Sequence, residues 1–293
     1  MSGEPHITSP KRLGSQALLT IDLDALVANF RAIAARAAPA QCAAVVKADA
    51  YGIGLVPAAQ ALSSAGCASF FVAHVAEAVR LRAALGDAPA QIYCLNGVSD
   101  DPAEIQILLG AQAFPVIGSM FEWAAWVKHA PGHAAALHVD TGMNRLGMSA
   151  QEAKAIADTP EAACVTLVLS HFASSEERDN PMNATQTAAF EAVRQLFSNA
   201  RASLANSSGV FLPTAPHYDL VRAGYALYGG NPTPGAPNPM QRVVSVHAPI
   251  IQVRDVEAGA MVGYNSTWRA PSRRRLATIG IGYADGLLRS ASG

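Results

Sequence analysis

The sequence is poor in charged and aromatic residues and contains little cysteine. Only 15% of its 293 residues are charged and 6% are aromatic, and 21 Lys and Arg face 22 Asp and Glu. The formal net charge of -1 leaves no basic surface to neutralise a phosphate backbone, which excludes a dedicated nucleic-acid binder. Polar residues interrupt every apolar run before it reaches membrane-spanning length, which argues against a membrane protein.

The four cysteines stand far apart in the sequence and form no C-x-x-C pair. We therefore expect neither a disulfide framework nor a metal site. The N-terminal residues contain no basic stretch followed by an apolar one, so no export signal is visible. These absences predict a cytoplasmic protein whose cysteines are small core residues in a reducing compartment.

Apolar residues are abundant, at 51% of the chain, and their arrangement predicts the fold. Short β-rich runs alternate with alanine-rich amphipathic stretches, which is typical of βα units around a parallel sheet. The β-rich runs predict eight strands, at 42–47, 68–73, 91–95, 112–117, 134–139, 163–170, 202–206 and 225–228. The amphipathic stretches predict helices at 22–37, 55–65, 74–85, 102–110, 119–129, 149–159 and 182–200.

Eight strands are the number that closes a TIM barrel. An open doubly wound sheet is the alternative, but it normally carries a glycine-rich phosphate turn after its first strand, and here the first strand ends in the sequence KADAYG at 47–52. We therefore predict an α/β protein whose residues 15–232 form a (β/α)8 TIM barrel.

The pattern changes after the proline-rich segment 231–239. The β-rich runs at 242–254, 260–264 and 275–283 have no helical period between them, which predicts a partial all-β domain over 233–293. Three strands leave unpaired edges. Either this domain takes strands from elsewhere in the chain, or it is incomplete.

Polar residues stand near the carboxyl ends of the predicted strands, where a TIM barrel carries its active site. They are Lys47, residues 140–145, His171, residues 206–209, and Arg222 with Gly224 just before the eighth strand. Lys47 closes an apolar run, where an ammonium is unfavourable unless it is paired or deprotonated. A desolvated lysine at a barrel mouth is a candidate nucleophile for a carbonyl compound, and the alternative is a lysine that reaches out to water.

The residues around Lys47, VVKADAYGIG at 45–54, resemble the pyridoxal-phosphate lysine motif of the alanine racemases. Further matching segments follow in the order of that family: DTGMNRLG at 140–147, SHFA at 170–173, NS at 206–207, VRAG at 221–224, ALYG at 226–229, VGY at 262–264 and GYADG at 282–286. The resemblance to this fold-type III family implies a barrel domain followed by a β domain. It also implies bound pyridoxal 5'-phosphate and a homodimer with shared active sites.

The resemblance also implies roles for individual residues. Lys47 would form the aldimine with the cofactor and move one α-proton, and Tyr264 from the other subunit would be the opposing base. Racemisation needs proton carriers on opposite faces of a planar carbanion, and His171, bonded to Arg222, would assist the phenol of Tyr264. Arg222 would face the pyridine nitrogen, which stays unprotonated because a guanidinium does not give up its proton.

The remaining implied roles concern the phosphate and the substrate. Ser207, Tyr51 and the backbone N–H groups of Gly224 and Tyr225 would hold the cofactor phosphate. Arg145 would orient the carboxylate of the substrate.

Two features depart from the family pattern. His138 stands where many members carry a carbamylated lysine, two residues before the Asp-Thr-Gly run, so Arg145 must be held in another way. The chain also ends soon after the GYADG segment. We therefore expect it to lack the C-terminal part of the family.

The predicted function is alanine racemase, which interconverts L-alanine and D-alanine by two-base proton transfer and supplies D-alanine for cell-wall peptidoglycan. A broad-specificity amino-acid racemase and a truncated, inactive form that only binds pyridoxal phosphate remain as alternatives. A barrel-type decarboxylase and a single-domain cofactor-homeostasis protein would use the same barrel and cofactor and are further alternatives. Tyr264 and the β-rich segment after residue 240 argue against the single-domain protein.

Overall fold

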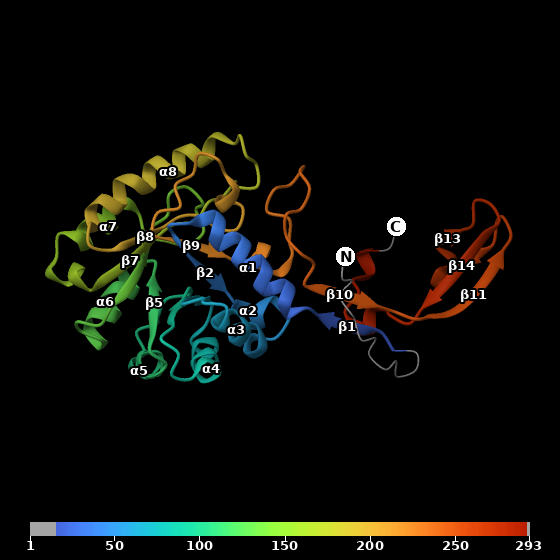
Figure 1. The fold of residues 1–293 in the computed structure, drawn as a ribbon, viewed down its shortest axis with the longest axis horizontal. Helices are drawn as coiled ribbons and strands as arrows, with labels where there is room; N and C mark the ends of the chain where they lie inside the picture. The colour runs from blue at the N-terminus through green and yellow to red at the C-terminus, as the bar shows by residue number, and fades with distance from the viewer. Residues whose placement is uncertain (1–15, 292–293) are drawn as a thin grey trace, which may run out of the picture. The chain divides into compact units, whose positions relative to one another are not determined.

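The computed structural model describes residues 16–291, so residue 15, where the predicted barrel domain begins, lies outside the described residues (Figure 1). The chain divides into two compact units. One unit spans Asp22–Val243, and the other joins the segment before Asp22 to the residues from Val244 onward. No helix among residues 16–291 is long and apolar enough to cross a membrane.

The larger unit is built on one sheet of eight parallel strands, in the order β8-β7-β6-β5-β4-β3-β2-β9. Their bounds are β2 Gln41–Val45, β3 Ser69–Val72, β4 Gln91–Cys94, β5 Ala113–Ile117, β6 Ala135–His138, β7 Val165–Leu169, β8 Arg201–Ser203 and β9 Leu220–Ala223. The two ends of this order also meet, because Asp219 N donates to Ala202 O (3.1 Å) and Arg222 N donates to Ala205 O (2.9 Å). The predicted TIM-like barrel is confirmed.

Helices follow the strands and lie outside them, as Figure 1 shows for α4 to α8. Their bounds are α1 Leu23–Ala37, α2 Lys47–Tyr51, α3 Leu55–Ser64, α4 Val75–Leu85, α5 Pro102–Gly110, α6 Met120–His129, α7 Ala150–Ala157 and α8 Pro181–Arg194. Polar side chains satisfy the free N–H groups at several helix starts. Asp22 accepts from Ala25 N (2.8 Å) at α1, and Ser149 accepts from Glu152 N (3.2 Å) at α7.

The prediction of an eighth strand at 225–228 is wrong. Those residues form the short 3-10 helix η4, Tyr225–Tyr228, and the eighth strand is β9, Leu220–Ala223. Both segments are short apolar runs, and such runs do not distinguish a strand from a buried helical turn. As a result Arg222 lies inside the last barrel strand and not before it.

The barrel interior is filled by large and small side chains from its strands. Phe71 and Tyr93 stack with ring centroids 4.7 Å apart, and alanine side chains leave room for them on other strands. The buried cluster consists of Ala43, Val45, Phe71, Tyr93, Val116, Ala136, Leu167, Leu169 and Leu220. This apolar plug closes the barrel below the carboxyl ends of its strands, so a ligand can enter only at the open end.

The smaller unit consists of antiparallel strand pairs. They are β1 Leu18–Ile21 with β10 Val244–His247, β11 Ile250–Val256 with β14 Arg274–Ile279, and β12 Met261–Val262 with β13 Trp268–Arg269. The predicted all-β character is confirmed. Strand β1 was missed because it has only four residues and runs directly into the cap of α1. This strand shows that the domain takes one strand, β1, from the N-terminal part of the chain, where it pairs with β10.

Asn29 on α1 joins this helix to the segments that follow the barrel sheet. Its side chain is 1% exposed, and its Nδ2 donates to Leu227 O (3.1 Å) and Gln241 O (2.9 Å). Its Oδ1 accepts from Gln241 N (2.7 Å). One buried amide therefore satisfies three backbone groups that are distant in sequence.

We expect Asn29→Ala to lower the free energy of unfolding by about 3 kcal/mol, because it leaves buried backbone groups without a partner. Urea unfolding of the two proteins measures the difference. Asn238→Ala is the matched control, since Asn238 makes similar backbone hydrogen bonds from an exposed position. Equal losses in the two variants would contradict the role given to burial.

Candidate active site

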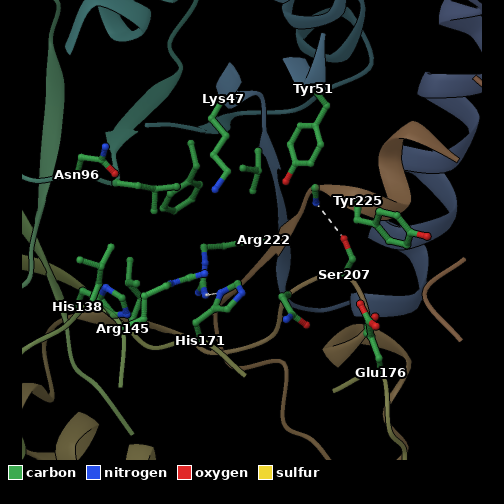
Figure 2. A pocket seen from close by; sticks show the side chains of 18 residues that line it. Lys47, Tyr51, Asn96, His138, Arg145, His171, Glu176, Ser207, Arg222 and Tyr225 are labelled. Carbon is green, nitrogen blue, oxygen red and sulfur yellow. Dashed lines mark hydrogen bonds between the residues drawn. The ribbon is translucent and has the colours of Figure 1, made fainter. Parts of the chain in front are cut away.

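A cavity of about 340 Å³ lies at the carboxyl ends of the barrel strands (Figure 2). Its lining residues all belong to the Asp22–Val243 unit. It brings together nearly all the residues singled out from the sequence: Lys47, Tyr51, His138, Arg145, His171, Ser207, Arg222, Gly224 and Tyr225. The volume is within the range of about 300–1,000 Å³ that is usual for small-molecule sites.

Lys47 stands at the start of an unusual turn. The four residues after it, 48–51, have φ angles of 53 to 56°, so they form a left-handed helical turn without glycine. Such a backbone is unfavourable by about 1–2 kcal/mol per residue and persists only where its surroundings hold it. In Figure 2 the amine of Lys47 and the hydroxyl of Tyr51 both point into the cavity from this turn.

Side-chain contacts fasten the left-handed turn from outside. Asp49 Oδ1 accepts from Leu55 N (3.1 Å) and from Arg80 Nη2 (3.0 Å). These contacts, that of Leu55 first, hold the pKa of the Asp49 carboxyl below its ordinary value. The N–H group of Ala48 donates to Glu77 Oε1 (2.6 Å). The turn is therefore held to its neighbours by the backbone N–H group of Ala48 and by the side chain of Asp49.

A cradle of donors lies across the cavity from Lys47. Ser207 Oγ accepts from Gly224 N (3.0 Å) and Ala226 N (3.2 Å), and Figure 2 shows the Tyr51 hydroxyl above this pair. A Cβ at position 224 would lie 2.6 Å from the Tyr51 hydroxyl oxygen, so only glycine permits this close approach. Burial raises the pKa of the Tyr51 phenol, which keeps it protonated and able to donate.

Arg222 is the most buried charged group of the site, with 4% of its surface exposed. Its Nη1 donates to Ser203 O (2.9 Å) and Ser203 Oγ (2.6 Å), and its Nη2 donates to Ser170 O. The same Nη2 lies 3.3 Å from His171 Nδ1. Burial lowers the pKa of Arg222 to about 10, so the guanidinium stays protonated at neutral pH.

Arg222 determines the tautomer of His171 and helps to keep its ring neutral. A guanidinium can only donate, so His171 Nδ1 accepts from it and the ring proton is on Nε2. Burial and the charge of Arg222 lower the pKa of His171 to about 3. The same two causes, burial first, lower the pKa of His138 to about 4. Both imidazoles are neutral at physiological pH.

The loop after β6 carries Arg145 to the cavity. Asp140 closes this loop, because its carboxylate accepts from the backbone N–H groups of Gly142, Met143 and Asn144 at 2.8 to 2.9 Å. Arg145 itself is exposed at the rim, and in Figure 2 it lies beside His138. A neutral histidine therefore lies beside this arginine.

Tyr264 lies in the other unit. It begins the short 3-10 helix η5, Tyr264–Ser266, and is 84% exposed. Lys47, His171 and Arg222 therefore line one cavity within the Asp22–Val243 unit. Tyr264 belongs to the smaller unit and does not line this cavity.

The sequence reasoning missed several lining residues. Asn96 follows β4 almost directly, so the strand-end rule that found Lys47 could also have found it. Glu176 lies in the loop after His171, where no spacing points to it. The apolar lining comes from Val45, Phe71, Leu95, Leu146 and Leu169. Across the described part of the chain, no three His, Cys, Asp or Glu side chains gather as metal ligands.

The fold and the cavity define a class of protein: barrel enzymes that present a lysine amine, a buried arginine and a cradle of donors at the carboxyl ends of their strands. The family model described as alanine racemase, N-terminal domain, matches residues 21–232, and that of alanine racemase, C-terminal domain, matches residues 243–293. The chain belongs to the alanine racemase family.

Individual relatives agree with the family models. The chain is 51% identical over 284 residues to an alanine racemase of Methylobacterium sp. (strain 4-46), covering 94% of this chain and 77% of that protein. It is 44% identical to a catabolic alanine racemase of Mesorhizobium japonicum, over 94% of this chain and 74% of that one. Its fold matches the crystal structure of alanine racemase from Bartonella henselae with covalently bound pyridoxal phosphate, with a TM-score of 0.86, 39% identity and coverage of 94% and 78%.

The comparisons correct one expectation. The C-terminal domain of the family is present, because its model matches residues 243–293. The expectation that the chain lacks the C-terminal part of the family is therefore not borne out. That expectation rested on the few residues that follow the GYADG segment at 282–286.

The depressed pKa of His171 predicts a pH dependence of stability. On unfolding, its pKa returns from about 3 to the ordinary 6.5, so below pH 6.5 the unfolded chain binds a proton that the folded chain does not. Stability therefore falls as the pH is lowered from 8 to 5, and His171 accounts for about 2 kcal/mol of the fall.

Urea unfolding at pH 8 and pH 5 tests this sign and size. The difference between the two pH values should be about 2 kcal/mol smaller in His171→Gln than in the parent chain. His133→Gln replaces an exposed histidine and serves as the control. If His171→Gln showed the full pH difference, the buried neutral state of His171 would be disproved.

Proposed function

We propose that this protein interconverts L-alanine and D-alanine with the help of pyridoxal 5'-phosphate, which the barrel domain (15–232) binds. The observation that carries the proposal is the cavity itself. The amine of Lys47 and the donors around Ser207 open into one space, and the guanidinium of Arg222 lies at its floor (Figure 2). The family to which the chain belongs and the names of its relatives support the same reaction.

The residues of the cavity fit this cofactor. Lys47 would hold its aldehyde carbon covalently. Ser207, the Tyr51 hydroxyl and the N–H groups of Gly224 and Tyr225 would hold its phosphate, with the Gly224 N–H exchanging its bond to Ser207 Oγ for one to the phosphate. Because Gly224 has no Cβ, the Tyr51 hydroxyl lies close to the backbone at this position, so donors from the two segments can converge on one anion. When bound, pyridoxal phosphate withdraws electrons from the α-carbon of an amino acid and so acidifies its α-proton.

The remaining steps belong to side chains of this protein. The Lys47 amine moves a proton at one face of the α-carbon, and Arg145 binds the carboxylate of the substrate. Arg222 donates hydrogen bonds but does not transfer a proton, because its guanidinium stays charged at neutral pH. His171 donates from Nε2, since its Nδ1 is occupied by Arg222.

We propose Tyr264 as the second proton carrier, acting in a homodimer in which each subunit completes the site of the other. Its exposure within its own unit leaves the phenol available to a partner subunit. Apolar side chains of the same unit, among them Ile250, Val253 and Met261, are also more than half exposed, as a subunit interface requires. The product D-alanine would serve cell-wall peptidoglycan. The relatives do not favour a broader racemase or a form that only binds the cofactor.

Lys47→Ala tests the covalent anchor. We expect the purified variant to lose the visible absorbance of the lysine-bound cofactor and to lose racemase activity by several orders of magnitude. Absorbance of the protein with added pyridoxal phosphate, followed by dialysis, measures this. Lys154→Ala, which removes an exposed lysine on α7, should leave both unchanged. A Lys47→Ala protein with the original absorbance would refute the assignment of the site.

Tyr264→Ala tests the second base. Exchange of the α-hydrogen with deuterium oxide should fall far more for L-alanine than for D-alanine, because Tyr264 serves one face and Lys47 serves the other. Nuclear magnetic resonance of each enantiomer follows the exchange. Tyr264→Phe keeps the ring without its hydroxyl and should behave like Tyr264→Ala. Equal losses with the two enantiomers would reject the two-base assignment.

A further inference from the structure

Glu77 lies at the start of α4, and its two carboxylate oxygens accept hydrogen bonds from two different loops. Its Oε2 accepts from Ala73 N (2.8 Å) and His74 N (3.2 Å), which belong to the loop that leads from β3 into its own helix. Its Oε1 accepts from Ala48 N (2.6 Å), which belongs to the loop after β2. The carboxylate therefore joins two neighbouring βα loops at the mouth of the barrel.

Two other helices of the barrel also carry a glutamate at their third position, and they show the ordinary capping contacts of such a residue. Glu122 and Glu152 stand at the equivalent third position of α6 and α7. Glu122 Oε2 accepts from Gly118 N and Ser119 Oγ, and Glu152 Oε2 accepts from Ser149 N and Ser149 Oγ. Those contacts lie within the loop that leads into the helix, as in a capping box. The bond from Glu77 to Ala48 is additional to capping.

That additional bond falls next to Lys47. On one side of the lysine, Val46 N donates to Phe71 O (2.8 Å) and keeps the end of the strand in the sheet. On the other side, Ala48 is the first residue of the left-handed turn, and its N–H group is held by Glu77. Lys47 is thus held between a sheet hydrogen bond and a charge-assisted one.

We infer that Glu77 is a positioning residue for Lys47: through the N–H group of Ala48 it holds the left-handed turn that aims the lysine amine into the cavity. The inference rests on the proposed function, in which that amine reacts. Glu77 does not line the cavity, so its effect reaches the reaction only through the backbone. A small displacement of a reacting group is enough to slow catalysis by about a hundredfold.

Glu77→Gln separates the two roles of the carboxylate. Glutamine also caps helices at this position, but it has one acceptor oxygen, so it can serve Ala73 and His74 or Ala48 and not both. We expect the melting temperature to stay within about 3 °C of that of Glu152→Gln, while kcat falls at least about tenfold and KM changes less than about threefold. Attachment of added pyridoxal phosphate to the apo chain, followed by absorbance, should slow to a similar extent.

A second substitution tests the link through the backbone. Ala48→Gly removes the penalty of the left-handed conformation, so the turn needs less support from outside. In the Glu77→Gln chain, Ala48→Gly should restore kcat and the rate of cofactor attachment at least about threefold. In the parent chain the same substitution should change them little. A residue that only caps α4 would show no such rescue.

The outcomes distinguish this inference from the proposed function. If Glu77→Gln matches Glu152→Gln in kcat and in cofactor attachment, or melts far below it, Glu77 does not position the lysine. If Lys47→Ala keeps the absorbance of the bound cofactor, the proposed function fails and the lysine needs no positioning.

Discussion

The buried guanidinium of Arg222 is the interaction on which both the barrel and the site depend. It lies in β9 and donates to oxygens of Ser203 in β8 and of Ser170 just after β7, so it joins the strands where the two ends of the sheet order meet. Burial of an ion is unfavourable unless hydrogen bonds replace the lost water, and these partners are carbonyl and hydroxyl oxygens. The charge is therefore satisfied without being neutralised, and it acts on everything around it.

That uncompensated charge explains the chemistry of the neighbouring groups. It lies against His171 Nδ1 and, after burial, is the leading cause that keeps His171 and His138 neutral. The guanidinium of Arg222 thus keeps its positive charge at neutral pH, whereas the imidazoles of His171 and His138 carry none. Such a centre can orient and polarise a bound group, and it leaves proton movement to the two groups proposed above, the amine of Lys47 and the phenol of Tyr264.

Much of the fold could be predicted from the sequence, because strands buried on both faces are continuous apolar runs and the helices between them are amphipathic. The eighth strand could not, since its four residues and those of η4 have the same apolar character. Strand β1 was too short to be recognised before α1. The places of Lys47, His171 and residues 206–209 at strand ends predict them as site residues, whereas the role proposed for Tyr264 rests only on a family motif. Neither the left-handed turn at 48–51 nor the hydrogen bond between Glu77 and Ala48 could be predicted from the sequence, because both depend on contacts between separate loops.

These contacts explain how a lysine beyond the end of a strand is held in place. Loops normally position functional groups less precisely than strands and helices do. Here the strand ends at Val45, yet Val46 still pairs with β3. Glu77 and Arg80 of α4 hold Ala48 and Asp49, the two residues that follow Lys47. One helix therefore holds the first two residues of the turn after the neighbouring strand. The strain of the left-handed backbone is tolerated because it is confined between these supports, and the direction of the amine follows from them.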